Sequence, residues 1–141
     1  MNQERNKATV RRYYEKLWSQ GQLELADEIF APEYENHDPA TPGGVLRGVA
    51  AFKALVTTYR EAFAGLKMDI LEQYAEGDVV VSRWTAQGTH QGALMGLPPT
   101  GKYASEIEGV TISRFAGERI VQDRAVWDLA GLLRKLGALP G

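Results

Sequence analysis

Three segments decide the fold of this chain: VVVSRWTAQGTHQ (79–91), KYASEIEGVTISRF (102–115) and RIVQDRAVW (119–127). In each of them, β-branched and aromatic residues recur at about every second position, which is the period of a β-strand with one buried face. The turn formers Pro98-Pro99-Thr100-Gly101 and Ala116-Gly117 separate the segments. Short connections join antiparallel neighbours, because a parallel crossover needs a dozen or more residues. The sequence therefore predicts an antiparallel meander.

Upstream of these segments the period of the apolar residues changes. A first strand of the meander is expected near 67–75, before the turn Glu76-Gly77-Asp78. Apolar residues three or four apart predict helices over 2–19, 25–30 and 49–63, and Pro32 is expected to end the second of these. Residues 33–48 are rich in proline and glycine, so a loop is predicted there. A short last helix is expected over 129–136.

Helices followed by a meander define an α+β domain in which the helices cover one face of a curved sheet. Gly88, Gly92 and Gly109 are expected to mark bends or bulges, because glycine tolerates the backbone geometry that a bulge needs. Strong curvature leaves a cavity beneath the helices, and this cavity is the predicted site. With 141 residues, the chain is expected to form one domain over 1–141.

Composition argues against several classes of partner and cofactor. The net charge is −2 and no Lys/Arg run occurs, so neither nucleic acid nor an anionic membrane is an expected partner. The chain has no cysteine, which suits a reducing compartment, and residues 1–16 lack a signal-peptide pattern, so a cytoplasmic location is expected. With only His37 and His90, a three-histidine metal centre is impossible, and no metal or cofactor is expected.

Two adjoining stretches resemble a known family. RWTAQGTHQG (83–92) followed by MGLPPTGK (95–102) is similar to the strand and loop that mark the SnoaL-like polyketide cyclases. YENHDP (34–39), ISRF (112–115) and GLLRKLG (131–137) agree with that family in order and spacing, so the resemblance covers nearly the whole chain. It implies the cone-shaped fold of nuclear transport factor 2, a pocket inside the cone for a small apolar organic substrate, and a homodimer or homotetramer.

The resemblance also implies a reaction, but this chain departs from the family at the residues that perform it. The cyclases it resembles close a ring by intramolecular aldol condensation, with an aspartate on the last strand and a histidine on the neighbouring strand. When the chain is aligned on Ile120, Asp128 and Gly131, these positions fall at Ala125 and Thr111. We expect Thr111 and Ala125 to contact the substrate, but neither can act as the family's acid or base.

Asp123 is the predicted catalytic acid or base. Alternation puts it on one face of the last strand with Val121, Ala125 and Trp127, and the resemblance implies that this face lines the cavity. An apolar pocket disfavours the charged carboxylate and raises its pKa toward the range useful for proton transfer. Two other interpretations remain open. Asp123 could pair with a charged cross-strand neighbour such as Arg114, or join Arg124 and Asp128 in the water-binding group of the superfamily's epoxide hydrolases.

Asn36 and His37 are candidates in the predicted loop. Asn36 aligns with a substrate-facing asparagine of the family, and the imidazole of His37 could relay a proton or bind a carbonyl. The alternative is that these residues, which precede Pro39, only form a turn. Core packing is the alternative for five further expected substrate contacts: Tyr14, Trp18, Tyr59, Phe63 and Trp84. His90 and Trp127 complete the expected contacts, and the alternative for His90 is that it satisfies loop backbone around Gly92.

The sequence thus favours a cofactor-free enzyme that moves protons on a carbonyl-bearing substrate, by aldol or isomerase chemistry. Two alternatives remain. The loss of the family's aspartate and histidine would suit a protein that only binds a small molecule. A cofactor-free hydroxylase, or the epoxide hydrolase already mentioned, would use the same fold for a different reaction.

Overall fold

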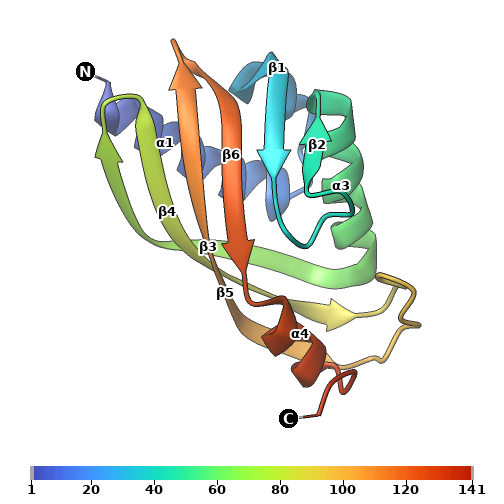
Figure 1. Cartoon of the computed structure of the whole chain (residues 1–141). Coiled ribbons are helices and arrows are strands. Elements are labelled where there is room, and N and C mark those ends of the chain that lie inside the picture. Colours follow the sequence, from blue (N-terminus) through green and yellow to red (C-terminus); the bar gives the residue numbers. More distant parts are fainter. Residues whose placement is uncertain (1, 141) are drawn as a thin grey trace.

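The computed structural model describes residues 2–140, in which helices pack against one face of a curved six-stranded sheet (Figure 1). The chain begins with helix α1 (Gln3–Arg12), the π-helix η1 (Tyr13–Trp18), the 3₁₀-helix η2 (Leu23–Leu25) and the one-turn helix α2 (Ala26–Ile29). Strands β1 (Phe30–His37) and β2 (Val45–Arg47) precede helix α3 (Val49–Ala62). The rest consists of β3 (Phe63–Glu76), β4 (Val79–His90), β5 (Tyr103–Ala116), β6 (Arg119–Trp127) and helix α4 (Leu129–Lys135).

The predicted meander is confirmed. The strand order is β2-β1-β6-β5-β4-β3, and strands β3 to β6 pair with their sequence neighbours in antiparallel fashion. Gly77 and Gly117 occupy the tight turns with φ of 59° and 63°, in the left-handed region that favours glycine. The parallel pairing of β1 with β6 makes the sheet mixed.

The predicted loop over 33–48 and the expectation of three helices before the first strand are both wrong. Two strands, β1 and β2, precede α3. Phe30, predicted to be helical, is the first residue of β1, and Pro32 lies inside that strand. The register of β1 against β6 shifts between Phe30 and Glu35, so the missing N–H of Pro32 falls where the ladder is interrupted. Beyond the shift, Asn36 lies level with Asp123.

The first helix extends through Trp18 as predicted, but its second half is π-helical. The N–H of Ser19 donates to the carbonyl of Tyr14, five residues earlier, at 3.1 Å. Tyr13 and Tyr14 are both buried although they are consecutive, and their rings stack with centroids 4.5 Å apart. The π-helix η1 thus places the phenols of both Tyr13 and Tyr14 against the inner face of the sheet.

The three glycines expected to bend the sheet differ in their roles. Gly88 lies at a register shift between β4 and β5, as predicted. No register shift occurs at Gly109, where a Cβ would lie 2.3 Å from a ring carbon of Trp84. Gly109 is therefore needed for close packing rather than for a bend. Gly92 lies past the end of β4, and a Cβ there would meet the carbonyl oxygen of Glu61 at 2.5 Å.

Two hydrophobic clusters form the core. The larger one joins α1, η1 and α3 to the sheet and includes Val10, Phe52 and Ile120. The smaller one joins the β3–β5 region to α4 and includes Phe63 and Leu132. The space between the helices, α4 and the inner face of the sheet is incompletely filled, and the candidate site lies there.

Candidate functional site

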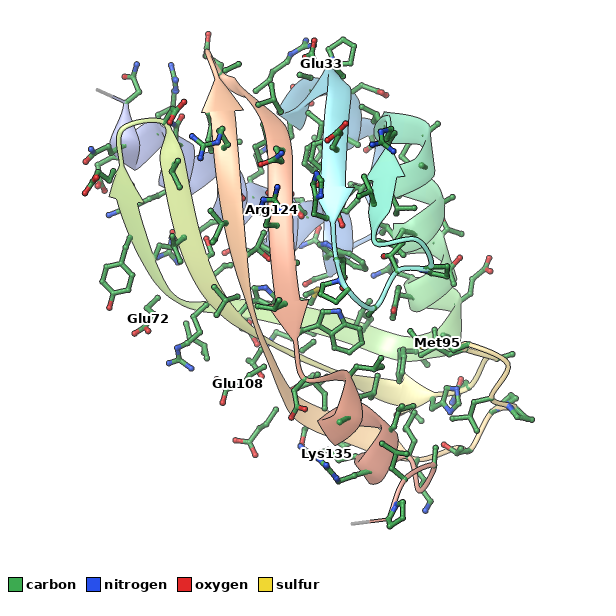
Figure 2. All side chains as sticks on the ribbon, viewed as in Figure 1. Glu33, Glu72, Met95, Glu108, Arg124 and Lys135 are labelled. Carbon is green, nitrogen blue, oxygen red and sulfur yellow. The ribbon has the colours of Figure 1, made fainter. Side chains whose placement is uncertain are left out.

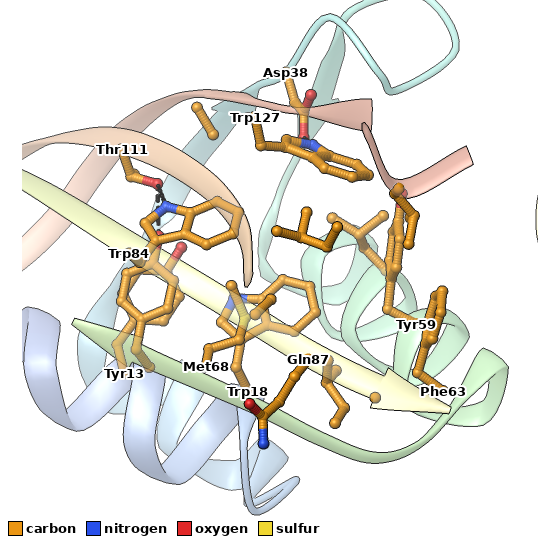
Figure 3. Close-up of a pocket in the computed structure, with 18 of the residues that line it drawn as sticks. Tyr13, Trp18, Asp38, Tyr59, Phe63, Met68, Trp84, Gln87, Thr111 and Trp127 are labelled. Carbon is orange, nitrogen blue, oxygen red and sulfur yellow. Dashed lines mark hydrogen bonds between the residues drawn. The ribbon is translucent and has the colours of Figure 1, made fainter. Parts of the chain in front are cut away.

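A pocket of about 100 Å³ lies between the helices and the inner face of the sheet (Figure 3). Figure 3 shows Thr111 and Trp84 on one side of it and Tyr59 and Phe63 on the other. Most of its wall is aromatic or aliphatic, and Asp38 is the one charged side chain among the residues that form it. The wall can therefore hold a largely apolar molecule and offers it few polar contacts.

One polar cluster in the wall is built around Thr111 on β5. The indole N–H of Trp84 donates to Thr111 Oγ1 at 2.9 Å, and the hydroxyl of Tyr14 lies 2.6 Å from the same oxygen. All three side chains are buried. Burial, with a contribution from Asp123, raises the pKa of Tyr14, so its phenol stays protonated at neutral pH.

Asp123 lies on the inner face of β6 and is fully buried, but it is not part of the pocket wall. Its Oδ2 accepts hydrogen bonds from the hydroxyls of Tyr13 at 2.9 Å and Tyr34 at 2.7 Å. Burial raises the pKa of Asp123, the nearby hydroxyls of Ser113, Tyr34 and Tyr13 lower it, and burial dominates. Of these partners only Tyr13 reaches the wall. Asp123 therefore connects to the pocket only through the phenol of Tyr13.

The two structural alternatives for Asp123 are wrong. Arg114 does not pair with it, because Arg114 forms a 3.4 Å ion pair with Asp78 at the surface. Arg124 is exposed, and Asp128 is exposed and caps α4 by accepting the N–H of Gly131 at 2.8 Å. These residues do not assemble into a water-binding group.

Asn36 lines the pocket from β1 and is 4% exposed. Its Nδ2 donates to the hydroxyl of Tyr34 at 3.0 Å, which fixes the orientation of the amide because that hydroxyl donates its own hydrogen to Asp123. Asn36 Oδ1 is buried without a hydrogen-bond partner among the described residues. It is therefore a free acceptor in the pocket wall.

Asp38 is a pocket carboxylate that the sequence analysis did not select. It follows the end of β1 and is partly exposed. Its Oδ2 accepts the indole N–H of Trp127 at 3.1 Å, and its Oδ1 accepts the N–H of Ala40 at 2.8 Å. Burial, with a smaller contribution from the charge of Asp38, raises the pKa of Tyr59 to about 12. Asp38 and Trp127 also border a second hollow, which Pro39, Ala40, Val126 and Leu129 complete.

Neither histidine belongs to the pocket wall. His37 lies level with the exposed Arg124, and its Nε2 is 3.1 Å from Glu35 Oε1. His90 is fully buried, and its Nδ1 accepts the backbone N–H of Thr100 at 3.2 Å. His90 therefore holds the loop between β4 and β5, in line with the alternative that it satisfies loop backbone.

The other predicted contacts come together around the pocket. Nine residues of the predicted set lie in its wall: Tyr14, Trp18, Asn36, Tyr59, Phe63, Trp84, Thr111, Ala125 and Trp127. The missed residues include Tyr13, Asp38 and Phe52. A signal for Asp38 was present, because alternation along a strand would put Tyr34, Asn36 and Asp38 on one face. This alternation was overlooked because residues 33–48 were predicted to form a loop.

Two features are absent from residues 2–140. No group of three or more His, Asp or Glu side chains in this part of the chain could hold a metal ion. No helix in it is long and apolar enough to span a membrane.

Comparison with known proteins agrees with this architecture. The family model for SnoaL-like polyketide cyclases matches residues 8–136. Nogalonic acid methyl ester cyclase of Streptomyces nogalater is 33% identical over 119 residues, covering 83% of this chain and 87% of that protein. Aklanonic acid methyl ester cyclase DnrD of Streptomyces peucetius is 30% identical over 139 residues, covering 91% and 88%. The structure of TsrD from Streptomyces laurentii superimposes with a TM-score of 0.87 at 24% identity, covering 99% of both chains.

The helices packed on a curved mixed sheet define an α+β fold of the nuclear transport factor 2 type. Within that class, the chain belongs to the SnoaL-like polyketide cyclase family.

Proposed function

We propose that the protein is a cofactor-free enzyme that moves protons on a small, largely apolar substrate bearing a carbonyl group. The observation that carries this proposal is the composition of the pocket wall, which is mostly apolar and includes a few groups suited to enolisation. These are the carboxylate of Asp38 and the hydroxyls of Tyr14 and Thr111. A carboxylate can remove a proton beside a carbonyl, and a hydroxyl can stabilise the oxygen that becomes negative.

The charges of the wall favour a neutral substrate. A ligand carboxylate would be buried near Asp38 with no Lys, Arg or His of the wall to compensate it. The names of the two relatives specify methyl esters, which are neutral. The pocket, at about 100 Å³, is smaller than the roughly 300–1,000 Å³ typical of drug-sized ligands. We therefore propose a ketone or ester with one or two rings.

In the proposed reaction, the carboxylate of Asp38 takes a proton from the carbon beside the carbonyl, and the C–H electrons form an enolate. The enolate carbon then attacks a second carbonyl to close a ring, and the alkoxide that forms takes the proton back from Asp38. Alternatively, Asp38 returns the proton to carbon and gives an isomer. Asp123 remains a predicted proton acceptor by an indirect path, in which a proton reaches Tyr13 as Tyr13 passes its own to Asp123. His37, outside the wall, has no part in this scheme.

The test uses 2-tetralone, a neutral bicyclic ketone, in D2O. Proton NMR measures the exchange of its α-protons with and without protein, and the surface variant Glu72→Gln serves as a control. We expect both proteins to accelerate exchange over buffer, and a carboxylated tetralone to be a much poorer substrate. Exchange at the buffer rate with wild-type protein would overturn the proposal.

A second candidate is a protein that only binds the ligand. It is supported by Thr111 and Ala125, which face each other across β5 and β6 where the resemblance places a histidine and an aspartate. Mass spectrometry of a bound ligand separates the candidates. A binding protein returns the ligand unchanged, a cyclase or isomerase returns an isomer, and a hydroxylase returns a product heavier by one oxygen atom.

We further propose that the protein is a cytoplasmic homodimer, or a homotetramer built from such dimers. Support comes from the outer face of the sheet, where four residues are register partners across the adjacent strands β3 to β6: Tyr74, Val81, Ile112 and Arg124. Tyr74 and Ile112 are 63% and 40% exposed, and Figure 2 shows Arg124 projecting from this outer face. Light scattering tests the assembly, and Ile112→Asp should reduce the measured mass to that of a monomer.

A further inference from the structure

The cluster around Thr111 contains more hydrogens than its own hydrogen bonds can use. Trp84 supplies one N–H, and Tyr14 and Thr111 supply one O–H each, which makes three polar hydrogens. The two contacts at Thr111 Oγ1 use two of them, since Trp84 can only donate and the two hydroxyls share one hydrogen bond. One hydroxyl hydrogen, on either Tyr14 or Thr111, is therefore left over.

The surroundings direct this spare hydrogen toward the pocket. Across the strand pair, Thr111 faces Ala125, whose methyl group accepts nothing. Tyr14, Trp84 and Thr111 are buried and all belong to the pocket wall. The competing acceptor is the oxygen of Tyr13, whose ring stacks on that of Tyr14 and whose own hydrogen is donated to Asp123.

We propose that Tyr14 and Thr111 form a shared hydrogen-bond donor that polarises the carbonyl oxygen of the substrate and stabilises it when it becomes an enolate. Trp84 orients the pair by occupying one lone pair of Thr111 Oγ1. The inference rests on the proposed function. In that function Asp38 removes the proton, and the shared donor stabilises the carbonyl oxygen. A donor held in a dry pocket needs no reorganisation when charge develops, and losing one such donor typically costs about 10²–10³-fold in rate.

A donor shared by Tyr14 and Thr111 responds to substitution differently from a donor that belongs to one residue. In Tyr14→Phe, Thr111 still accepts from Trp84 and keeps its own hydrogen free. In Thr111→Val, the phenol of Tyr14 and the indole of Trp84 lose their shared partner, so both of their hydrogens become free. Each single variant thus retains at least one donor within about 3 Å of the original one. Only the triple variant Tyr14→Phe/Trp84→Phe/Thr111→Val has none, so the effects of the substitutions should be strongly non-additive.

The experiment measures binding and a vibrational frequency, whereas the proposed function is tested by turnover. Failure of the donor proposal can therefore be distinguished from failure of the proposed function. The probes are acetophenone and α-methylstyrene, which differ by C=O against C=CH2. The C=O stretch of bound acetophenone reports a donated hydrogen bond by moving below its position in hexane. Tyr74→Phe and Thr85→Val are matched controls outside the cluster, because Tyr74 is exposed and the buried Thr85 hydroxyl has no partner among the described residues.

We expect a lowered C=O frequency in the wild type, in both controls and in both single variants, and the hexane frequency in Tyr14→Phe/Trp84→Phe/Thr111→Val. The preference for acetophenone over α-methylstyrene should fall about 2- to 10-fold in the triple variant alone, as expected for one net hydrogen bond. Tyr14→Phe/Trp84→Phe/Thr111→Ser should restore both signals, which separates a lost donor from a damaged fold.

Three results would overturn the proposal. The first is an unshifted stretch in the wild type, as when Tyr13 takes the hydrogen or the probe does not bind. The second is loss of the shift in one single variant, and the third is an unchanged shift in a folded triple variant. If the triple variant does not fold, the wild-type frequency and the two single variants still decide between these outcomes.

Discussion

Asp123 lies on β6 and Asp38 directly follows the neighbouring strand β1, yet the two carboxylates have different surroundings. Asp123 lies level with Asn36 on β1, and Asp38 lies two residues further along that chain. Asp123 is fully buried and held by two phenols, whereas Asp38 is partly exposed and touches the pocket. A displacement of two residues thus turns a carboxylate that organises the core into one that a ligand can reach. Strand alternation alone cannot make this distinction.

The largest effect is expected from removing the donors around Asp123. Tyr13→Phe/Tyr34→Phe leaves a buried carboxylate without its two hydroxyl partners and should lower the free energy of unfolding by about 3–5 kcal/mol at pH 7. Urea denaturation measures it, with Tyr74→Phe/Tyr103→Phe as the exposed control. A loss below about 1 kcal/mol would mean that Asp123 is not held as the structure indicates.

A smaller effect concerns the pH dependence of stability. The folded-state pKa of Asp123 is raised above its ordinary value of 3.8, so between the two values the folded state binds more protons than the unfolded state. The contribution of Asp123 therefore falls as pH rises from about 4 through the folded-state pKa. Asp123→Asn removes this titration, so its free energy of unfolding should rise relative to that of the wild type as the pH increases from 4 to 7. Parallel stability curves would contradict the raised pKa.

The smallest effect is expected at Asp38. Trp127→Phe removes the indole N–H that donates to its carboxylate, but water can replace that donor because Asp38 is partly exposed. The free energy of unfolding should fall by no more than about 1 kcal/mol. Thermal or urea denaturation measures it, and a loss as large as that of the Tyr13/Tyr34 double variant would erase the difference between the two carboxylates.

The parts of the fold that the sequence predicted are those with local signals. The meander has clear period-two patterns and glycine turns at Gly77 and Gly117, and α3 has a regular apolar stripe. Strand β1 has no such signal, because Pro32 interrupts it and its partner β6 lies some 90 residues away in sequence. The π-turn at Tyr13 is likewise set by packing rather than by local propensity.

The site was predictable to the same extent. The inward positions of Thr111, Ala125 and Trp127 follow from alternation once the strands are known. Asp38 was missed because β1, the strand that it follows, was predicted to be a loop. Alternation gave the direction of Asp123 correctly, but only the positions of Tyr13 and Tyr34 decide that it is closed off from the pocket.

The most direct test of the account is the exchange of 2-tetralone α-protons in D2O by Asp38→Asn and Asp123→Asn, with both variants checked for folding. If Asp38 takes the proton directly, Asp38→Asn should lose at least about 100-fold in rate, the lower end of typical general-base contributions, and Asp123→Asn should stay within about tenfold of wild type. The reverse order would place the base at Asp123, acting through Tyr13, and would contradict the account.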